Sequence, residues 1–354
     1  MKKIKFSFNS EVEKIIKKFS LNNDWNKNIN QDIDKYKSKK FNKKSFNRKD
    51  LKKLDFVTID GEDAKDFDDA VYCEKHESNW KLYVAIADVA HYVENNSNID
   101  KEARKRGTSV YFPGFVIPML PEILSNNLCS LRSGEDKFTV MAEIIIGKDG
   151  KIKSYKFYNA LISSSARLTY TQVDDFLNKK KSITDKNVIK NINNLFSLYK
   201  ILKKSREKRH AVNFDTQEFS FLISKNNEIT GIKNNIRLES QKLIEECMIA
   251  ANVASSLFIK KNKSNSLYRV HDEPTLEKIE DASISLKNLG YSLNKTKIIC
   301  TEEINKIIEL SKKRLDDHLV TSIILRAMAR AEYTPKNIGH FGLSLKSYNH
   351  FTSP

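Results

Sequence analysis

The chain has few of the residues that characterise secreted, disulfide-linked or membrane-spanning proteins. Its 354 residues include 4 cysteines, 10 glycines, 6 prolines and 2 tryptophans. It contains no stretch of about eighteen apolar residues, which excludes a helix that crosses a membrane. The basic N-terminus also lacks the long apolar segment and the small-residue cleavage site of a secretory signal. We therefore expect a cytoplasmic protein with no membrane partner.

Cysteine spacing and glycine content exclude further classes of site. The four cysteines lie far apart, and no two of them form a CxxC pair. Such spacing is typical of reduced thiols in a cytoplasm, and it disfavours a zinc site built from thiolates. The sequence has no internal repeat and no glycine-rich phosphate-binding loop of either common type.

The chain is strongly basic, with a formal net charge of +17 and a pI near 9.4. An excess of positive charge indicates a polyanionic partner such as RNA. However, only 12 of the 62 basic residues are arginine, and asparagine and isoleucine are abundant, which is the amino-acid usage of an AT-rich genome. Arginine is the better marker of phosphate contact here, because lysine cannot copy its planar, two-donor geometry. The arginines considered as candidates are Arg104, Arg106, Arg132, Arg167, Arg209, Arg237 and Arg269.

Carboxylates are concentrated in one short segment, residues 58–70, with the sequence TIDGEDAKDFDDA. So many like charges in a folded segment are unfavourable unless a cation lies among them. Oxygen ligands suit hard divalent cations, and Mg²⁺ commonly takes one or two carboxylates together with waters and substrate phosphate. The segment therefore predicts a one- or two-metal site for phosphoryl transfer. Its acidic residues are Asp60, Glu62, Asp63, Asp66, Asp68 and Asp69.

Other interpretations of this segment remain open. A solvated acidic loop or a single Ca²⁺-binding turn is the simplest, because exposed charge is ordinary for Asp and Glu. Phe67 and Ala70 alternate with the acids and strand-like residues flank them, which weakens that interpretation. An EF-hand is disfavoured, since its characteristic glycine and final glutamate are missing. A DNA nuclease or a haloacid-dehalogenase-like phosphatase can also use a DxDD sequence, but strands on both sides of Asp69 argue against the phosphatase.

The order of predicted elements favours an α+β fold. Runs rich in β-branched and aromatic residues fill residues 55–162, and two short strands follow near FSFLI and NEITGIK. Apolar residues spaced three to four apart then predict a series of helices. These helices are 186–208, 238–263, 275–289, 301–314 and 316–332. Because no linker separates the two halves, we assign residues 55–354 to one domain.

Residues 1–54 are expected to lead into that domain as a helix followed by a basic linker. Residues 10–19 predict a short amphipathic helix, with Ser10 as its N-cap and Glu13 completing a capping box. Residues 22–53 are rich in asparagine and lysine, which indicates a mobile linker. A basic arm that grips phosphate is the alternative.

Two aromatic residues and a pair of glutamates are further candidates for a site. Prolines and a glycine in YFPGFVIPMLP predict an irregular loop that presents the ring of Tyr111. Tyr111 and Phe214 are each explained either by core packing or by stacking on bases. Glu245 and Glu246 are adjacent on a predicted helix, so one of them must face its apolar side, where it needs a metal or a cationic partner. A solvated helix face is the alternative for this pair.

Six motifs occur in the order found in the bacterial ribonuclease R and ribonuclease II family. They are TIDGEDAKDFDDAVYCE, YFPGFVIPMLPE followed by LCSLR, RHAVNFD, EECMIAANVA, LYRVHDEP and GHFGLSLKSYNHFTSP. The chain resembles this family from about residue 50 to its last residue, and GEDAKDFDDA and LYRVHDEP are most similar to ribonuclease R. The resemblance implies an RNB-type catalytic domain, with a sheet-rich half and a helical half around an RNA channel.

The resemblance also implies an activity and a metal site. Members of the family are hydrolytic 3′-to-5′ exoribonucleases that degrade single-stranded RNA to nucleoside 5′-monophosphates. Asp60, Asp66, Asp68 and Asp69 would be the residues that hold Mg²⁺, with Mn²⁺ as a substitute. Asp68 and Asp69 would also be catalytic, and Asp68 would be the residue most directly tied to the chemistry.

Residues outside the acidic segment receive roles from the same resemblance. Glu245 would complete the site near the attacking water. Tyr111 would fix the 3′-terminal nucleotide, and Phe214 would stack on the bases. On residue type rather than on the resemblance, Arg167 and Arg209 are expected to contact the RNA.

The sequence departs from the family where it stops, at HFTSP. In the family, an arginine that stabilises charge on the scissile phosphate follows within a few residues, and its loss would cost on the order of 10³ in rate. Barrel domains on both sides of the catalytic domain are also missing. We expect a monomer that is either a fragment or half of a split enzyme completed by a separate C-terminal polypeptide; a decayed gene product is a third interpretation. The competing function is an RNA-binding module without turnover.

Overall fold

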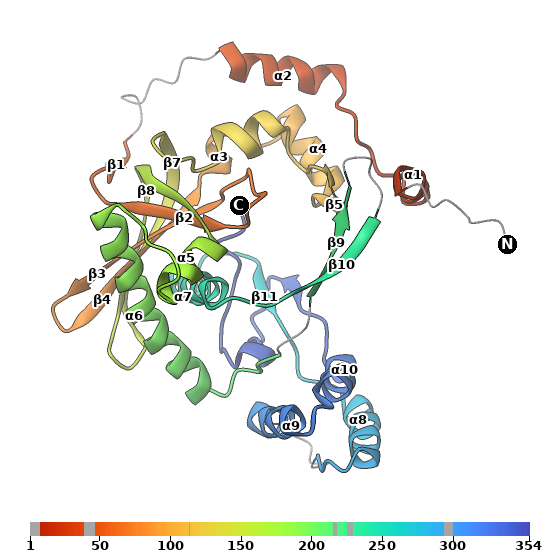
Figure 1. Cartoon of the computed structure of the whole chain (residues 1–354). Helices are drawn as coiled ribbons and strands as arrows, with labels where there is room; N and C mark the ends of the chain where they lie inside the picture. Colours follow the sequence, from red (N-terminus) through yellow and green to blue (C-terminus); the bar gives the residue numbers. More distant parts are fainter. Residues whose placement is uncertain (1–7, 39–46, 113, 215–217, 225–228, 294–299) are drawn as a thin grey trace.

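A six-stranded mixed sheet forms the centre of the structure, a computed structural model (Figure 1). The structure describes residues 8–38, 47–112, 114–214, 218–224, 229–293 and 300–354. In spatial order the strands are β1 (Lys49–Asp50), β8 (Ile152–Thr169), β2 (Phe56–Asp60), β3 (Asp69–His76), β4 (Asn79–Ala87) and β7 (Asp136–Ile146). Because β7 also pairs with β8, five of these strands form a closed circuit, and β1 is added outside it.

The long strand β8 closes the circuit by pairing with different partners along its length. From Ile152 to Ser163 it runs antiparallel to β7. From Ser164 to Thr169 it runs parallel to β2, with Thr169 opposite Asp60. The end of β8 therefore lies beside the start of the acidic segment.

Both faces of the sheet are covered, which explains why the strands contain long apolar runs rather than a strict alternation. Helices α5 (Tyr170–Leu177), α6 (Lys186–Lys208) and α7 (Glu239–Lys261) cover one face. Helices α2 (Lys27–Ser38), α3 (Val89–Tyr92) and α4 (Asn98–Arg106) cover the other. Neighbouring strand residues divide between the two cores: Val57 and Val71 point to the first, and Phe56 and Ala70 to the second.

A third apolar cluster lies in the helical half, which Figure 1 shows apart from the sheet. It is formed mainly by α8 (Leu276–Asn288), α9 (Thr301–Arg314) and α10 (Asp317–Ala327). Short elements complete the fold. They are the hairpins β5 (Val110–Phe112) with β6 (Phe115–Ile117) and β9 (Glu218–Ile223) with β10 (Ile229–Asn235), the pair β11 (Tyr268–Val270) with β12 (Glu332–Thr334), the π-helix η2 (Leu124–Leu128) and the 3₁₀ helix η3 (Phe341–Leu343).

The structure confirms the predicted α+β class and most of its elements. Helices α6 and α9 begin and end as the apolar spacing predicts, and Thr275 caps α8 by accepting a hydrogen bond from the backbone N–H of Lys278. The prediction of an irregular loop after Tyr111 is wrong. The hairpin β5–β6 forms there, with Tyr111 opposite Val116, because its glycine, Gly114, occupies the turn at a positive φ of 74°.

The N-terminal prediction also needs correction. The first helix, α1 (Phe8–Lys18), begins before Ser10, so Ser10 lies inside the helix instead of capping it. Residues 22–53 contain helix α2, whose Ile29 is fully buried in the second core. Arg48 is buried in an ion pair with Asp88 at 2.6 Å, with its guanidinium over the ring of Phe138. Burial of these residues anchors parts of the predicted linker to the domain; residues 39–46 lie outside the described ranges.

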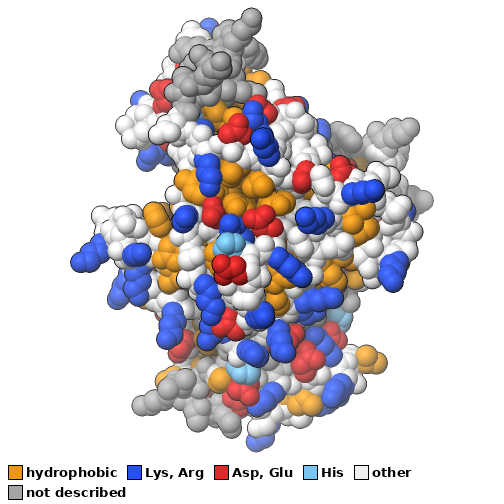
Figure 2. Space-filling view, turned by 90° about the vertical axis from the view of Figure 1, so that its left-hand side faces the viewer, with side chains coloured by type: hydrophobic (Ala, Val, Ile, Leu, Met, Phe, Trp, Pro, Cys, Tyr) orange, Lys and Arg blue, Asp and Glu red, His pale blue; other side chains and the backbone are white. Residues whose placement is uncertain are grey.

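The face of the molecule shown in Figure 2 has no patch of a single charge. Figure 2 shows Lys and Arg dispersed among Asp and Glu over the side of the molecule that carries α6. Within the described ranges, no helix has the length and apolar character needed to cross a membrane.

Candidate active site

The acidic segment connects two paired strands of the sheet. Asp60 is the last residue of β2 and Asp69 is the first residue of β3, and these strands run antiparallel with Val57 opposite Val71. Asp66 and Asp68 lie in the loop between them. The chain thus leaves the sheet at Asp60 and returns to it at Asp69. The four aspartates therefore lie at one end of this pair of strands.

Electrostatic coupling shows that these carboxyl groups lie close together. Burial, then the negative charges of Asp66 and Asp60, raise the pKa of Asp68 to about 6. Burial, then the charges of Asp60 and Asp68, raise the pKa of Asp69 to about 7. The pKa of Asp60 is also raised, chiefly by burial, although the backbone N–H of Gly61 donates a hydrogen bond to its carboxylate at 2.7 Å. Protein atoms surround the carboxyl group of Asp68, but the residue is still exposed to solvent.

The donor chemistry of these residues fits a hard divalent cation. The raised pKa values of Asp68 and Asp69 reflect burial first and then the negative charge of neighbouring aspartates. A cation bound among the carboxylates would compensate that negative charge. In the described part of the chain, however, no three Asp, Glu, His or Cys side chains converge closely enough to hold a metal ion as they stand. The aspartates therefore fit the ion in kind, and their side chains would have to rotate to bind it.

Contacts from two distant segments hold the backbone of the acidic loop. The hydroxyl of Ser130 accepts a hydrogen bond from the N–H of Phe67 at 3.0 Å and donates one to the carbonyl of Lys65 at 2.8 Å. The guanidinium of Arg167, on β8, donates to the carbonyls of Gly61 at 2.9 Å and Glu62 at 2.7 Å. Arg167 was expected to contact RNA; in the structure its described hydrogen bonds are with this loop.

Tyr111 presents its ring beside the aspartates. It lies on β5 and is 69% exposed. The pKa of its phenol is raised, first because the hydroxyl is partly buried and then by the negative charge of Asp66, with smaller effects from Asp68 and Asp60. The structure therefore brings Tyr111 and the acidic loop together, as the proposed roles require.

A second tyrosine, Tyr170, lies at this site, and it was not among the residues predicted from the sequence. The pKa of its hydroxyl is raised by burial and then by Asp60 and Asp69, so this hydroxyl also lies near the carboxylates. Tyr170 is the first residue of α5 and directly follows Thr169, the partner of Asp60 in the β2–β8 pairing. Only that pairing reveals the proximity, because the two residues are far apart in the sequence.

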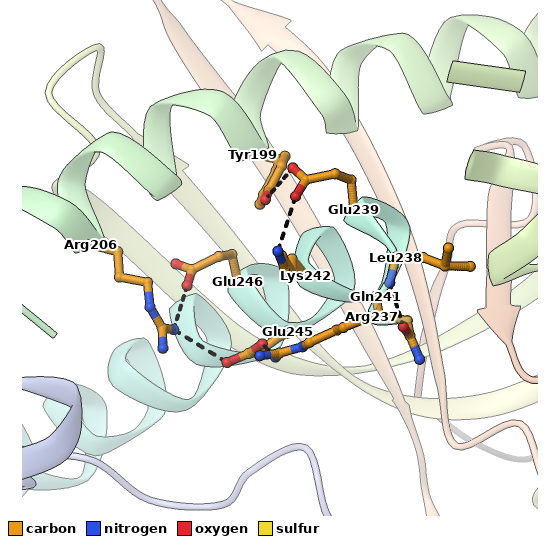
Figure 3. A network of polar contacts seen from close by, with 9 residues as sticks. All are labelled: Tyr199, Arg206, Arg237, Leu238, Glu239, Gln241, Lys242, Glu245 and Glu246. Carbon is orange, nitrogen blue, oxygen red and sulfur yellow. Dashed lines mark hydrogen bonds and ion pairs between the residues drawn. The ribbon is translucent and has the colours of Figure 1, made fainter. Parts of the chain in front are cut away.

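The glutamate pair on α7 is held by arginines (Figure 3). Glu246 is the buried member, at 4% exposure, and it binds Arg206 at 2.8 Å. Glu245 binds Arg206 at 3.3 Å and also pairs with Arg237. Figure 3 shows both carboxylates turned towards these guanidinium groups. Among the interactions of the described residues, none joins Glu245 to the aspartates.

A polar cavity of about 560 Å³ adjoins this pair, between the ends of α6, α7 and α9. Its lining includes Arg206, His210, Asn213, Arg237, Glu245 and Asn305. Phe214 follows directly after Asn213, but its ring packs, partly buried, against the third apolar cluster. Arg209 is half-buried and donates from Nε to the carbonyl of Leu343 at 3.0 Å. These two residues therefore belong to the helical half of the molecule, whereas Tyr111 belongs to the sheet half.

The fold and the site together define a class of protein: α+β domains in which clustered aspartates at the end of paired strands adjoin an exposed aromatic residue. Residues 48–354 match the RNB domain, and the chain belongs to the RNB family. The predicted resemblance is thereby confirmed. The ribonucleases of this family are metal-dependent in general.

Individual relatives support the same assignment. Ribonuclease R of Escherichia coli is 45% identical over 301 residues, which cover 84% of this chain and 37% of that protein. Ribonuclease R of Buchnera aphidicola subsp. Schizaphis graminum is 43% identical over 335 residues, covering 93% of this chain and 46% of the relative. The structure of Mycoplasma genitalium RNase R in complex with ribose-methylated single-stranded RNA matches with a TM-score of 0.93 and 31% identity, covering 98% of this chain and 55% of that one. The chain thus spans about half or less of the length of these relatives.

Proposed function

We propose that this protein is a 3′-to-5′ hydrolytic exoribonuclease that degrades single-stranded RNA to nucleoside 5′-monophosphates. The observation that carries the proposal is the cluster of four aspartates beside the exposed ring of Tyr111 on an RNB fold. The RNase R of Mycoplasma genitalium, which shares this fold, binds single-stranded RNA. A phosphodiester held by its terminal base on Tyr111 would lie next to the carboxylates.

The four aspartates would bind the metal ion that the hydrolysis requires. Asp60, Asp66, Asp68 and Asp69 would hold Mg²⁺, or Mn²⁺ in its place, which when bound would lower the pKa of the attacking water and neutralise charge on the scissile phosphate. Asp68 is exposed and the other three aspartates are half-buried, which suits Asp68 to the point where water and RNA would enter.

The other candidate residues retain the roles towards RNA that were expected of them. They are Tyr111, Phe214, Arg167, Arg209 and Glu245. Tyr111 offers the exposed face that stacking on a terminal base requires. Phe214 and Arg209 would act in the helical half, where their side chains are partly covered. Glu245 would reach the attacking water only after its pairs with Arg206 and Arg237 are exchanged. The contacts of Arg167 favour an additional role, which is developed in the next subsection.

A non-catalytic RNA-binding module is the second candidate. Two features favour it: Glu245 is held by arginines, and in the described ranges no three potential ligands already converge on a metal position. This candidate predicts the same affinity for RNA without turnover. It therefore differs from the first in the chemical step alone.

The deciding experiment is a denaturing-gel time course with 5′-labelled single-stranded RNA, in Mg²⁺ and in EDTA. We expect the full-length label to collapse to a very short end product in Mg²⁺ alone. Asp68→Asn should abolish this turnover, by on the order of 10³ or more, while its RNA affinity on a native gel stays within a few-fold of the unsubstituted chain. Intact RNA that still binds would support the second candidate, and a parallel loss of binding and turnover in Asp68→Asn would refute the role of Asp68.

We further propose a cytoplasmic monomer in which residues 55–354 form the catalytic domain. The described structure supports the location through its cysteines, since Cys73, Cys129, Cys247 and Cys300 are all free thiols. Completion by a separate C-terminal polypeptide stays a prediction. Co-purification from the source cells, followed by mass spectrometry and measurement of the molar mass in solution, tests these proposals together.

A further inference from the structure

Ser130 and Arg167 lie outside the acidic motif but make side-chain contacts with its backbone. Ser130 is fully buried, two residues after the end of the π-helix η2. Its hydroxyl binds the backbone on both sides of Asp66, at the carbonyl of Lys65 and the N–H of Phe67. One side chain therefore fixes the peptide units that flank this carboxylate.

Arg167 holds the other end of the loop. Its Nη2 donates to two successive carbonyls, those of Gly61 and Glu62, directly after Asp60. Its guanidinium also lies 5.6 Å from the centre of the Phe67 ring, which is buried. Bonds of this kind, from a charged donor to carbonyl oxygens, are stronger than those between neutral groups. Arg167 thus links the start of the loop to the residue that Ser130 holds at its end.

Backbone contacts complete the attachment of the loop to the sheet. The N–H of Leu131 donates to the carbonyl of Phe67 at 2.9 Å, and the N–H of Ala87 donates to the carbonyl of Asp68 at 2.9 Å. These bonds persist whichever side chain occupies positions 130 and 167. The two side chains therefore control the part of the loop between Gly61 and Phe67, inside which the described structure has one backbone hydrogen bond, from the N–H of Ala64 to the carbonyl of Gly61.

We propose that Ser130 and Arg167 are positioning residues that hold the backbone beside Asp60 and Asp66 in place, so that their side chains can turn towards one divalent cation. The inference rests on the proposed function, because it assigns these residues to the metal site of that function. Their action is through the backbone, so neither residue needs to touch RNA or metal. Residues that orient metal ligands typically contribute about tenfold to hundredfold in metal affinity.

The experiment measures binding of Mn²⁺ alone to the full chain, by electron paramagnetic resonance of the free ion. We expect Ser130→Ala and Arg167→Met each to raise the Mn²⁺ dissociation constant by about tenfold to hundredfold. RNA affinity in EDTA should not change in Ser130→Ala, because Ser130 has no proposed contact with RNA. Arg167→Lys, which keeps the charge but not the two-donor geometry, should lie between Arg167→Met and the unsubstituted chain.

Matched controls separate positioning from a general loss of packing. Ser256 is also fully buried, but its hydroxyl donates to the carbonyl of Val253 within its own helix. Arg314 donates from Nη2 to the carbonyl of Leu289 and stacks over Tyr291, far along the chain in the helical half. Ser256→Ala and Arg314→Met should leave Mn²⁺ affinity unchanged. Urea unfolding of each variant shows whether the altered protein is still folded under the binding conditions.

Three results would overturn the inference. Unchanged Mn²⁺ affinity in both Ser130→Ala and Arg167→Met would refute it directly. Loss of RNA affinity with normal Mn²⁺ binding in Arg167→Met would make this arginine an RNA contact instead. If Asp68→Asn bound Mn²⁺ as well as the unsubstituted chain does, there would be no metal site to position. Failure to cleave RNA, by contrast, would refute the proposed activity while leaving the Mn²⁺ measurements valid.

Discussion

Among single residues, Tyr111 combines an exposed ring with a hydroxyl close to the aspartates. Since its ring is 69% exposed, removing it should change the free energy of unfolding little. Stacking of one base on an aromatic ring contributes about 1–3 kcal/mol. We therefore predict that Tyr111→Ala weakens capture of a 3′ end about five- to 150-fold, measured by titration of labelled single-stranded RNA in EDTA.

Two further variants identify what the ring of Tyr111 does. Tyr111→Phe keeps the stacking face and should bind RNA like the unsubstituted chain. Phe19, in the N-terminal segment, is similarly exposed at 64%, and Phe19→Ala should not affect the end product. If Tyr111→Ala left both the affinity for RNA and the product ladder unchanged, the stacking role of Tyr111 would be refuted.

Among single residues, clustering along the chain could be predicted from the sequence, but contacts between distant residues could not. The clustering of Asp60, Asp66, Asp68 and Asp69 was visible because these residues are neighbours in the chain. The contacts of Ser130 and Arg167 were not, because they join side chains to backbone carbonyls more than sixty residues away and leave no spacing pattern. Residue type suggested that Arg167 contacts phosphate, but residue type alone cannot distinguish a phosphate oxygen from a carbonyl oxygen.

At the scale of elements, helices were predicted better than the chain between them. Helices α6 and α9 follow from apolar spacing because each buries one face against a neighbour. Helix α2 was missed since its sequence is polar, and it is stabilised by burial of Ile29 that only the fold supplies. The closure of the sheet by β8 was equally hidden, because a strand that changes partners along its length has no sequence signature.

Histidines connect β11 with the chain around η3, and this junction should be sensitive to pH. His271 accepts a hydrogen bond from the N–H of Gly342 and contacts the ring of His340 at 5.1 Å. Burial, and then the neighbouring charge of His271, lower the pKa of His340 to about 4. Arg269 and His350 also face this group and act in the same direction.

The sign of the pH effect follows from this lowered pKa. Below about pH 6.5 the unfolded chain protonates His340 and the folded chain does not, so the contribution of this residue to stability is lost as the pH falls towards 4. We predict that His340→Asn, which keeps an acceptor for the N–H of Leu343, flattens the dependence of the free energy of unfolding on pH. The measurement is urea unfolding at several values between pH 4 and pH 7.5.

The pH dependence of the free energy of unfolding must be compared between variants, because other titratable groups stabilise the folded state as the pH falls. The raised pKa values of Asp68 and Asp69 favour the folded state as the pH falls. His76→Asn, on the exposed end of β3, is the matched control for loss of a histidine outside this junction. If the free energy of unfolding changed with pH equally in His340→Asn and the unsubstituted chain, His340 would not contribute to the pH dependence.

For the whole molecule, the position of the aspartates couples metal binding to folding. The acidic loop joins β2 to β3, inside the circuit of strands that both large cores cover. Unfolding this sheet separates the carboxylates, so a cation that needs several of them binds the folded state far better than the unfolded state. Such a ligand stabilises the fold by an amount that grows with its concentration, about 2.7 kcal/mol at one hundred times its dissociation constant.

We therefore predict that Mg²⁺ raises the midpoint of thermal unfolding of the unsubstituted chain and that Asp68→Asn responds much less. Potassium chloride at the same ionic strength serves as the control, because screening of the net charge of +17 would act on both chains alike. In Asp68→Asn the loop also loses one of the charges that raise the pKa of Asp69, so its midpoint without metal should not fall below that of the unsubstituted chain. Equal responses of the two chains to Mg²⁺ would mean that the ion acts on the general surface charge, and the aspartates would then have to be explained without a metal.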